Sequence, residues 1–385
     1  MAVRLVEPVP AWKRVRYAAI EAARQLYHAP GRAAFRQRLR NLRKADGGEP
    51  KVSFGWLHDP ARPSETGIGG AVKLAHLRRR FGEARESFNI LYLVSSVLHL
   101  VPHVEELVSW AKRNGVKVVW NQNGVAYPAW CGDYYPWFNA PMSRLIRQAD
   151  FVVYQSEFCR ACADRYLGPV NAPWEVLWNP VDVRHFTPGA VLDAGRWELL
   201  AMGTNHSFYR VKASLDCLAA LVADGVSARL TIAGEMRWPG GDDEVARTID
   251  ALGVRDRVRL LPPFTQEEAA GLYRNAHVLL HPKYKDPCPT VPIEAMACGI
   301  PVVGSRSGGM PELVPPDCGE LADVPDDWCA DHAPAARALA DGVRRVMEDR
   351  ERRSAAARAR AEAVFDQERW VQRHEDIFLA LLSRR

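Results

Sequence analysis

The sequence predicts an α/β protein of two domains, each a parallel β-sheet covered by helices on both faces. Its 385 residues are enough for two to three domains of ordinary size. Short apolar segments typical of buried strands alternate with longer segments of helical periodicity. The alternation is interrupted at residues 175–188 and begins again at residue 197. Strands that alternate with helices are typical of parallel sheets, because each crossover helix lies on a face of the sheet.

The first domain is predicted to span residues 48–185, after an N-terminal extension of residues 1–47. Its strand segments are short and rich in branched apolar and aromatic residues, and its helix segments have one apolar face. A Gly ends the second helix segment, as is common at helix C-termini. The expected strands are 51–57, 89–96, 116–123 and 149–156, and the expected helices are 71–80, 104–115 and 157–167.

The second domain is predicted to span residues 186–365, and it follows a short strand and an interdomain crossing at 175–188. It repeats the order of strand and helix, so a second parallel sheet is expected. A last amphipathic helix is predicted over residues 366–385. The expected strands are 197–203, 228–235, 258–262, 277–282 and 301–304, and the expected helices are 212–225, 243–253 and 266–276.

The composition is that of a globular protein, with 48% apolar and 25% charged residues. No apolar run approaches the ~20 residues that a membrane-spanning helix needs, and the N-terminus lacks the pattern of a secretory signal. The eight cysteines are scattered, which is typical of a reducing cytoplasm, so a cytoplasmic location is predicted. Only Cys159 and Cys162 form a CxxC pair, which favours two half-buried thiols over a metal or redox site.

Positive charge is concentrated at the N-terminus. Residues 1–45 contain 11 Lys and Arg against two acids, whereas the remainder contains 40 basic and 44 acidic residues. Apolar residues are interleaved with the arginines, which is typical of either a helix on an anionic membrane surface or a solvated extension. No nucleic-acid-binding module follows the segment, so no nucleic acid is expected as a partner. A peripheral position on the inner face of the cell membrane is therefore one of the two predictions.

Residues 281–314 carry the most informative pattern of the chain. Asp286 and Glu294 are separated by seven residues, and Glu294 is expected to begin a short helix that Gly299 ends. A short apolar strand and a Gly-Gly loop before a second helix follow. Two loops that lead into helices and carry carboxylates suit a ligand with phosphates and hydroxyls. Helix N-termini bind phosphates, and carboxylates accept hydrogen bonds from sugar hydroxyls.

This pattern resembles the donor-binding signature of glycosyltransferase family 4, whose members are retaining enzymes of the GT-B fold. The family has an acid-x7-acid motif, then a small-Gly-x-Pro-Val strand and a Gly-Gly-x-Pro-Glu loop. The resemblance implies two Rossmann-like βαβ domains that face each other across a cleft, with the C-terminal helix crossing back to the first domain. It also implies transfer of a sugar from a nucleotide diphosphate sugar (UDP or GDP) to an acceptor hydroxyl, with retention, in glycan or polysaccharide biosynthesis.

The resemblance also implies the donor-binding residues. Family members usually have Arg soon after the first strand of the second domain and Lys at the next helix start, and both neutralise the diphosphate. Lys212 matches that Lys, whereas Thr204 follows Gly203, so Arg210 is expected to replace the missing Arg. Gly234 and Glu235 match the family's loop near the nucleotide.

Within the signature, Asp286 is expected to face the hydroxyls of the donor sugar, and Glu294 to accept hydrogen bonds from the ribose. The backbone amides of Thr290 and Val291 are expected to bind the diphosphate, since Pro289 has no N–H to donate. The predicted catalytic residues are therefore Lys212, Asp286 and Glu294. Glu312 is expected to be a structural first-turn acid.

Gly69, Gly70, Gln122 and Asn123 are predicted to lie on the acceptor side. Gln122 stands where the family often has His, and an amide binds a hydroxyl but does not exchange a proton near pH 7. The acceptor is expected to be a glycan or a lipid-linked glycan. Aromatic residues between 120 and 138 either stack on it or pack in the core. No Asp-x-Asp motif follows a strand, so no metal and no other cofactor is expected.

Three other functions remain open. A sugar-nucleotide epimerase or hydrolase on the same fold would need a carboxylate or His beside the 2-position of the sugar, and no residue clearly supplies one. A catalytically inactive nucleotide-sugar-binding module fits the missing Arg and His. A membrane scaffold fits the basic segment at residues 1–45. Labelled sugar nucleotides distinguish them, because transfer needs an acceptor, epimerisation does not, and an inactive module only binds.

Overall fold

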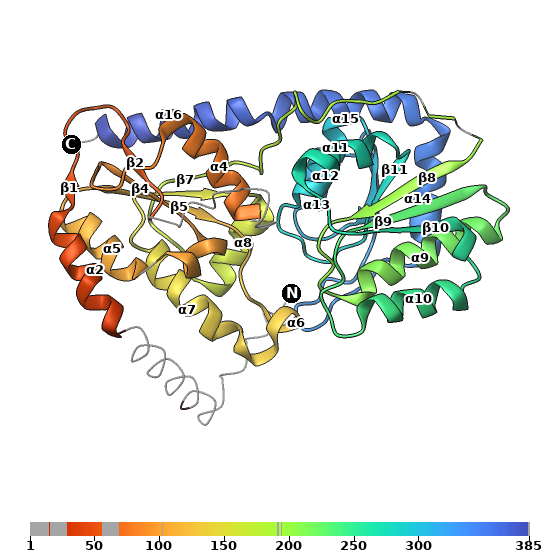
Figure 1. Cartoon of the computed structure of the whole chain (residues 1–385), viewed down its shortest axis with the longest axis horizontal. Helices are drawn as coiled ribbons and strands as arrows, with labels where there is room; N and C mark the ends of the chain where they lie inside the picture. The colour runs from red at the N-terminus through yellow and green to blue at the C-terminus, as the bar shows by residue number, and fades with distance from the viewer. Residues whose placement is uncertain are drawn as a thin grey trace.

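The computed structural model describes residue 15 and residues 29–55, 69–101, 103–190, 192–193 and 195–383. These residues form two α/β domains that lie side by side, and the chain passes between them twice (Figure 1). Each domain has a sheet whose strands all pair in parallel. The predicted fold class is therefore confirmed.

The first domain contains a five-stranded sheet in the order β2-β4-β5-β6-β7. Its central strands, β4 (Ile90–Val94) and β5 (Lys117–Gln122), are almost wholly buried, because helices cover both faces. The aromatic segment after β5 forms helices that the sequence did not predict. The other elements are β2 (Val52–Ser53), β6 (Phe151–Tyr154), β7 (Trp174–Val176), α4 (Gly69–Phe81), η1 (Ser95–Leu100), α5 (Val104–Arg113), α6 (Pro128–Cys131), η2 (Gly132–Tyr134), α7 (Tyr135–Ile146) and α8 (Glu157–Tyr166).

The second domain contains a six-stranded sheet in the order β10-β9-β8-β11-β12-β13. Two of its helices begin four residues earlier than predicted: α9 (Phe208–Ala223) and α12 (Thr290–Ala297). Glu294 therefore lies inside α12 and does not begin it. The other elements are β8 (Trp197–Met202), β9 (Ala228–Ala233), β10 (Val258–Leu261), β11 (Val278–His281), β12 (Val302–Ser305), β13 (Gly319–Ala322), α10 (Gly241–Ala251), η3 (Arg255–Arg257), α11 (Gln266–Arg274), α13 (Met310–Leu313), α14 (Ala336–Glu348) and α15 (Arg350–Val364).

Part of the basic N-terminal segment belongs to the first domain. Helix α2 (Ala29–Asn41) buries Phe35 and Leu39 in the core of this domain, and Leu42 follows them. Strand β1 (Arg43–Lys44) then pairs with β3 (Ser87–Phe88). The domain boundary predicted at residue 47 is therefore too late, because the three apolar side chains lie on one face and pack. The predicted membrane-contacting or solvated segment otherwise lies outside the described residues.

The two crossings between the domains are hydrogen-bonded to each other. Val181 donates its N–H to Phe365 O at 2.8 Å, and Gln367 donates to Val181 O at 3.0 Å. Helix α16 (Gln367–Ser383) then packs against the first domain, where Trp370 and Phe378 join the core. The predicted return of the C-terminal helix to the first domain is confirmed (Figure 1).

The cysteines of the CxxC pair are buried free thiols on α8, as the sequence favoured. Cys159 donates its thiol to the carbonyl oxygen of Asn123, which ties α8 to the end of β5. None of the described helices is both long enough and apolar enough to cross a membrane.

Candidate functional site

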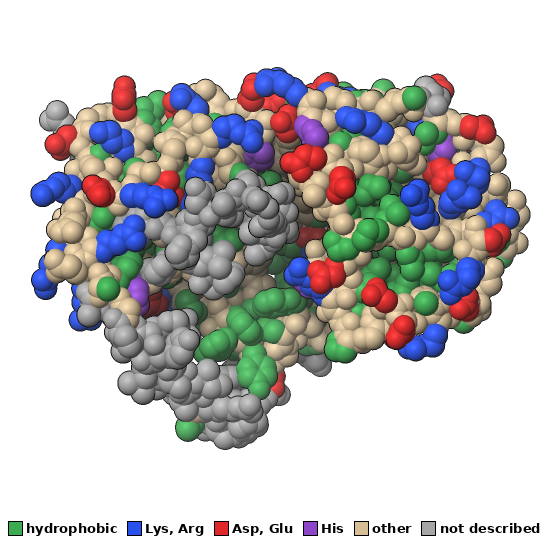
Figure 2. All heavy atoms as spheres, viewed as in Figure 1, with side chains coloured by type: hydrophobic (Ala, Val, Ile, Leu, Met, Phe, Trp, Pro, Cys, Tyr) green, Lys and Arg blue, Asp and Glu red, His purple; other side chains and the backbone are tan. Residues whose placement is uncertain are grey.

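The order of the second sheet places a topological switch point between β8 and β11. From β8 the chain moves to β9 and β10 on one side, and from β11 it moves to β12 and β13 on the other. Ligands of open parallel sheets bind beyond the carboxyl ends of the strands at such a point. The loops that follow β8 and β11 face the first domain, and the surface is hollowed where the two domains meet (Figure 2). The candidate site is therefore built from these two loops.

Two glycines bring the ends of β8 and β9 into backbone contact. Gly203 and Gly234 have φ angles of +114° and +118°, and a Cβ on Gly234 would lie only 2.2 Å from Gly203 O. A Cβ on Gly203 would lie 3.6 Å from a methyl carbon of Val291, in the first turn of α12. Three of the predicted donor-side residues therefore meet here. Glu235 lies beside them but is exposed, and its carboxylate pairs with Arg237 at 2.6 Å.

Asp286 is the central acid of the site. Its side chain is buried, with Lys283 Nζ at 2.9 Å and His281 Nε2 at 3.4 Å from Oδ2. Burial by itself would raise the pKa of this carboxyl, but Lys283 and His281 hold the pKa well below its ordinary value. Asp286 is therefore ionised throughout the neutral pH range. His281 Nε2 is buried and has no hydrogen-bond partner among the described residues.

Arg210 lies in the first turn of α9, within the electrostatic field of the same acid. Its Nη1 donates to Thr204 O at 2.9 Å, whereas its buried Nε has no hydrogen-bond partner in the described part of the chain. Burial lowers the pKa of Arg210, and the charge of Asp286 opposes this change. Because the guanidinium stays charged in proteins, the site holds a half-buried cation whose buried Nε is an unused donor. Such a donor is rare in a protein interior unless a ligand or water completes it.

Further positive charge surrounds His206, in the loop between β8 and α9. Burial lowers the pKa of His206, and the charges of Lys283, Arg237 and Arg210 lower it further. These charges reach His206 from three different segments, and the carboxylate of Glu235 opposes them. Cations that converge in this way favour an anion as a ligand.

Lys212 does not join this site, contrary to the prediction. Its ammonium pairs with Asp216 at 2.6 Å, one helical turn along α9, and its side chain is 51% exposed. Because α9 begins at Phe208, Lys212 lies in the second turn, on the face opposite the buried Ser214 and Leu221. The helix register therefore directs Lys212 into solvent.

Glu294 forms a separate network on the other side of α12. Its carboxylate accepts hydrogen bonds from Gln266 Nε2 and from Tyr273 OH, both at 2.8 Å. Burial raises the pKa of Glu294, and these two hydrogen bonds oppose the shift. The partners lie on α11, so Glu294 faces that helix.

Helix α12 is held rigidly by its C-terminal end. Gly299 ends it at a φ of +70°, and Ser354 Oγ donates to Gly299 O at 2.5 Å. Arg358 donates to Ala297 O at 2.6 Å. The C-terminal carbonyl groups are thus partnered, whereas the first-turn N–H groups, which include those of Thr290 and Val291, have no partner within the helix. They remain available to an anion.

The Gly-Gly loop fills a structural role. A Cβ on Gly308 would lie 2.3 Å from Asp286 O, and one on Gly309 would lie 2.2 Å from Pro287 O. Gly309 also donates its N–H to Asp286 O at 2.8 Å. These glycines therefore allow the backbone of the Asp286 loop to pass closely, and they position that loop without opening onto a ligand.

Glu312 joins the two domains. Its carboxylate accepts hydrogen bonds from the N–H groups of Glu157 and Phe158, at 2.8 and 2.7 Å. It thus caps α8 of the first domain from the second domain, a favourable place for a negative charge. The structural role predicted for Glu312 agrees with these contacts, although its partners lie in the other domain.

On the first-domain side, the side chains of the predicted acceptor residues Gln122 and Asn123 form hydrogen bonds within the domain. Gln122 accepts a hydrogen bond from Trp120 Nε1 at 2.8 Å and donates to Asn123 O at 3.0 Å. Asn123 Oδ1 accepts a hydrogen bond from Lys73 Nζ at 2.6 Å. Both amides therefore lie in the wall of the domain, contrary to the predicted acceptor contact. Gly69 and Gly70 begin α4, and the loop before them lies outside the described residues.

Two functional candidates escaped the sequence analysis. Lys73 is only 2% exposed, and its ammonium also donates to Asn121 and Gln155; burial lowers its pKa to about 8. Nothing in an amphipathic helix distinguishes this Lys from a surface Lys. Lys283 did offer a signal, since a cation three residues before Asp286 in the same loop is well placed to reach it.

The aromatic segment after β5 divides into packed and exposed residues. Tyr127 packs edge to face against Trp328 of the second domain, with ring centroids 5.4 Å apart. Trp130 and Phe138 are 62% and 42% exposed. Figure 2 shows hydrophobic side chains over α6 and α7, beside the hollow between the domains. The packing interpretation therefore applies to Tyr127, and stacking on an acceptor stays a prediction for the exposed residues.

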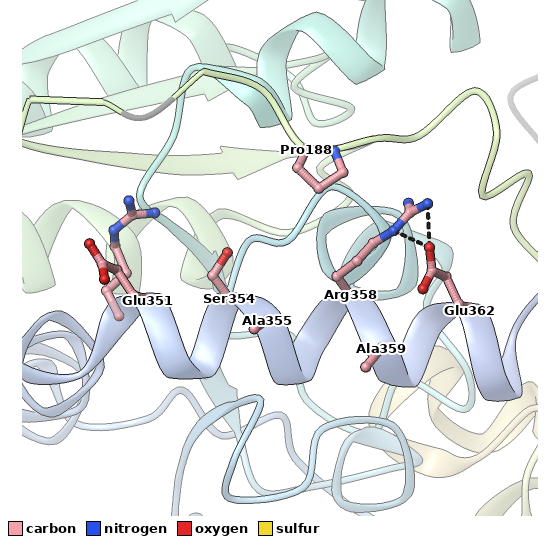
Figure 3. Close-up of a pocket in the computed structure, with 8 residues that line it drawn as sticks. Pro188, Glu351, Ser354, Ala355, Arg358, Ala359 and Glu362 are labelled. Carbon is pink, nitrogen blue, oxygen red and sulfur yellow. Dashed lines mark hydrogen bonds and ion pairs between the residues drawn. The ribbon is translucent and has the colours of Figure 1, made fainter.

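A depression of about 440 Å³ lies elsewhere, on the outer face of α15 (Figure 3). Arg358 projects there, pairs with Glu362 and donates to the carbonyl oxygens of Val183 and Phe186. These bonds attach the first interdomain crossing to α15, so the side chain has a structural use. The depression is remote from the loops after β8 and β11.

Comparison with known proteins identifies the second domain. Residues 190–362 match the family described as glycosyl transferases group 1. The D-inositol 3-phosphate glycosyltransferase of Nocardiopsis dassonvillei is 31% identical over 208 residues, which cover 49% of this chain and 48% of that protein. The one from Mycolicibacterium smegmatis is 33% identical over 165 residues, 40% of this chain and 38% of that protein. The match thus spans less than half of the length of these relatives.

Solved structures resemble a larger part of the chain. Sucrose-phosphate synthase from Thermosynechococcus elongatus superposes with a TM-score of 0.63 at 20% identity, covering 82% of this chain and 78% of that one. Anabaena HepE in complex with UDP gives a TM-score of 0.62 at 16% identity, with 81% and 82% covered. At these identities the likeness concerns the fold, and it confirms the predicted GT-B arrangement.

Proposed function

Because residues 190–362 match the family of group 1 glycosyl transferases, we propose that this protein is a glycosyltransferase acting on a nucleotide diphosphate sugar. The observation that carries the proposal is a buried, ionised Asp286 paired with Lys283, in the electrostatic field of a half-buried Arg210 whose Nε lacks a partner among the described residues. A carboxylate for hydroxyls and cations for phosphates are what the two halves of such a donor require.

The diphosphate would bind between Arg210 and the first turn of α12. Arg210 supplies a charged donor, and the N–H groups of Thr290 and Val291 supply neutral ones at the positive end of the helix dipole. These donors are fixed before the reaction, since α12 is anchored at its C-terminal end by Ser354 and Arg358. Fixed donors stabilise the charge that develops on the departing diphosphate.

The two acids would hold the two sugars of the donor. Asp286 lies near the phosphate-binding cations and would accept hydrogen bonds from the transferred sugar. Glu294 faces α11 and would accept them from the ribose, displacing or sharing the contacts of Gln266 and Tyr273. Positioning of the sugar against the acceptor then contributes most of the remaining rate. Retention, a metal-independent reaction and deprotonation of the acceptor by the leaving phosphate are part of the proposal.

UDP is the first nucleotide to test, because Anabaena HepE, a structural neighbour, has been solved with UDP and with UDP-glucose. The family match does not reach the first domain, so the acceptor is left as a glycan or a lipid-linked glycan. Contact with an anionic membrane through the basic N-terminal residues, on the cytoplasmic face, belongs to the same proposal.

A thermal-shift screen with UDP, GDP, ADP and their sugars tests the binding part. We expect at least one of them to raise the melting temperature, because ligands that bind only the folded state stabilise it. The shift should disappear in Glu294→Ala and persist in Glu351→Ala, an exposed acid on α15. No shift with any nucleotide would contradict the proposal.

The same labelled donor then separates transfer from its alternatives. Transfer requires an added acceptor, whereas an epimerase or a hydrolase changes the labelled sugar without one. A module that only binds leaves the label on the nucleotide under both conditions. Label found on an added glycan acceptor is the result that the proposal predicts.

A further inference from the structure

The structure places only one of the two predicted diphosphate-binding cations at the candidate site. A nucleotide diphosphate carries several negative charges, and the predicted pair of cations consisted of Arg210 and Lys212. Lys212 is turned into solvent and is paired with Asp216. An i,i+4 pair on a helix surface is an ordinary solvated contact, so nothing holds Lys212 in readiness for a ligand.

Lys283, unlike Lys212, lies at the candidate site. It lies two residues beyond the end of β11, at the topological switch point, and its side chain is 35% exposed, so it reaches both protein and solvent. Its ammonium is 2.9 Å from Asp286 Oδ2. An ammonium has three N–H donors, and the structure assigns only this one acceptor to it within the described residues.

The neighbouring residues of the loop point elsewhere. Tyr284 OH accepts the N–H of Asp327 and donates to the carbonyl oxygen of the same residue, at 2.7 and 2.9 Å. The Lys285 ammonium is buried, 3.9 Å from the centre of the Trp328 ring. Lys283 and Asp286 therefore face the site, whereas Tyr284 and Lys285 attach the loop to residues 326–328. The loop holds Lys283 in place through its own backbone.

The electrostatic surroundings of Lys283 agree with this position. Its charge acts on Asp286, His281 and His206, which belong to the loops after β11 and β8. The charge of Arg210 acts on the same two histidines. Arg210 from α9 and Lys283 from the loop after β11 thus approach one space from two sides.

We infer that Lys283, and not Lys212, is the second cation that binds the diphosphate of the donor. The inference rests on the proposed function. Without ligand, Lys283 pairs with Asp286 alone. When a nucleotide diphosphate binds, the ammonium keeps that pair and donates a second hydrogen bond to a phosphate oxygen. The acid that faces the sugar and the cation that faces the phosphate are then linked by one contact.

Isothermal titration with UDP, GDP, ADP and the UDP-sugars tests the inference on the full chain. We expect Lys283→Met to weaken nucleotide diphosphate binding at least tenfold, and Lys212→Met to leave it within twofold. Equal binding by Lys283→Met and the wild type would overturn the inference, and so would an equal loss in Lys212→Met. If the wild type binds none of these nucleotides, the proposed function fails, and the inference fails with it.

A second comparison separates phosphate binding from mere positioning of Asp286. If Lys283 only orients the acid, Lys283→Met weakens the nucleotide sugar but not the free diphosphate, which would overturn the inference. Asp286→Asn removes the acid and frees the Lys283 ammonium. We therefore expect this variant to bind the free nucleotide diphosphate at least as tightly as the wild type, and the nucleotide sugar more weakly. Melting temperatures without ligand show that each variant is folded.

Discussion

The two domains present opposite kinds of polar surface to the space between them. On the second domain, Arg210 Nε and His281 Nε2 are buried without hydrogen-bond partners among the described residues. On the first domain, the ammonium of Lys73 uses all three of its donors on the amide oxygens of Asn121, Asn123 and Gln155. His76 Nδ1 of the first domain also lacks a partner among the described residues, so the contrast is between two clusters: the loops after β8 and β11 hold an unused donor, whereas the Lys73 ammonium is saturated.

This difference indicates which domain recognises a ligand through fixed polar groups. Buried polar atoms in proteins are nearly always paired, so unpaired ones mark a place that a ligand or water completes. A saturated network instead rigidifies the domain that contains it. The network of Lys73 continues through Asn121 to Tyr92 and then to His374 of α16. The Lys73 network therefore stiffens the wall of the first domain, and the exposed aromatic residues of α6 and α7 are its predicted acceptor contacts.

The largest expected effect is a loss of stability at the Lys73 network of the first domain. Lys73→Met leaves three buried amide oxygens without a donor, so we expect the free energy of unfolding to fall by about 3 kcal/mol. Nucleotide affinity should stay within twofold. Urea denaturation and titration measure the two quantities. Lys112→Met, which removes a half-exposed Lys that pairs with Asp150, is the control and should cost less than 1 kcal/mol. A large loss of nucleotide affinity in Lys73→Met would break the comparison.

The next largest expected effect is a loss of nucleotide affinity at Arg210 of the second domain. Arg210→Ala removes a charged donor from the proposed phosphate site, so we expect nucleotide diphosphate affinity to fall roughly 30- to 100-fold. Stability should change little, because Lys283 and His281 still face Asp286. Isothermal titration measures the affinity, with Arg196→Ala as the control, since Arg196 lies just before β8, at the end of the strand away from the site, and pairs with Glu198. Unchanged binding in Arg210→Ala would mean that its free Nε has no ligand.

A smaller effect is expected at the contact between the domains. Glu312→Gln weakens the cap on α8, and we expect a loss of about 1 kcal/mol in the free energy of unfolding. Nucleotide affinity should be retained, because the residues proposed to bind the nucleotide sugar all lie in the second domain and do not include Glu312. Urea denaturation of this variant is compared with that of Glu348→Gln, which replaces an exposed acid on α14. Equal unfolding midpoints for the two variants would argue against the cap.

The smallest effect on stability is expected at the aromatic surface. Trp130 is 62% exposed, so Trp130→Ala should change the free energy of unfolding by less than about 0.5 kcal/mol. If the exposed rings bind the acceptor, the KM for a glycan acceptor should rise while nucleotide affinity stays constant. Steady-state transfer assays measure this. Trp174→Ala, a change at a 44% exposed Trp on β7, is the control. The same KM in both variants and the wild type would move acceptor recognition elsewhere.

Much of the fold followed from local pattern. The strands from 89–96 to 301–304 were found to within a few residues, because buried parallel strands are short apolar runs bounded by turn residues. Gly299 was correctly taken as a helix end, and Asp286 was correctly placed in the loop between β11 and α12. These are properties that the residue type and its immediate neighbours decide.

The errors arose where packing decided the outcome. The start of α9 was placed at Lys212, because Ser207, Phe208 and Tyr209 have no helical signal of their own. The burial of Val211 and the contact of Phe208 with Trp238, 6.1 Å between ring centroids, extend the helix to Phe208. That extension turns Lys212 outward. In the same way, the Arg-rich segment around α2 hides three apolar residues whose burial is visible only against the rest of the domain.

The sequence by itself determined the two parallel α/β domains, the return of the last helix, the acid-x7-acid loop and its glycines. Each of these follows from a short-range pattern of apolar, acidic or flexible residues. Only the tertiary structure decided which cations meet Asp286, why the amides of Gln122 and Asn123 are occupied, and that Lys73 is buried. A long basic side chain carries the same signal on any helix, and its role depends on the charges and carbonyl groups that distant segments bring within reach of its terminal nitrogen.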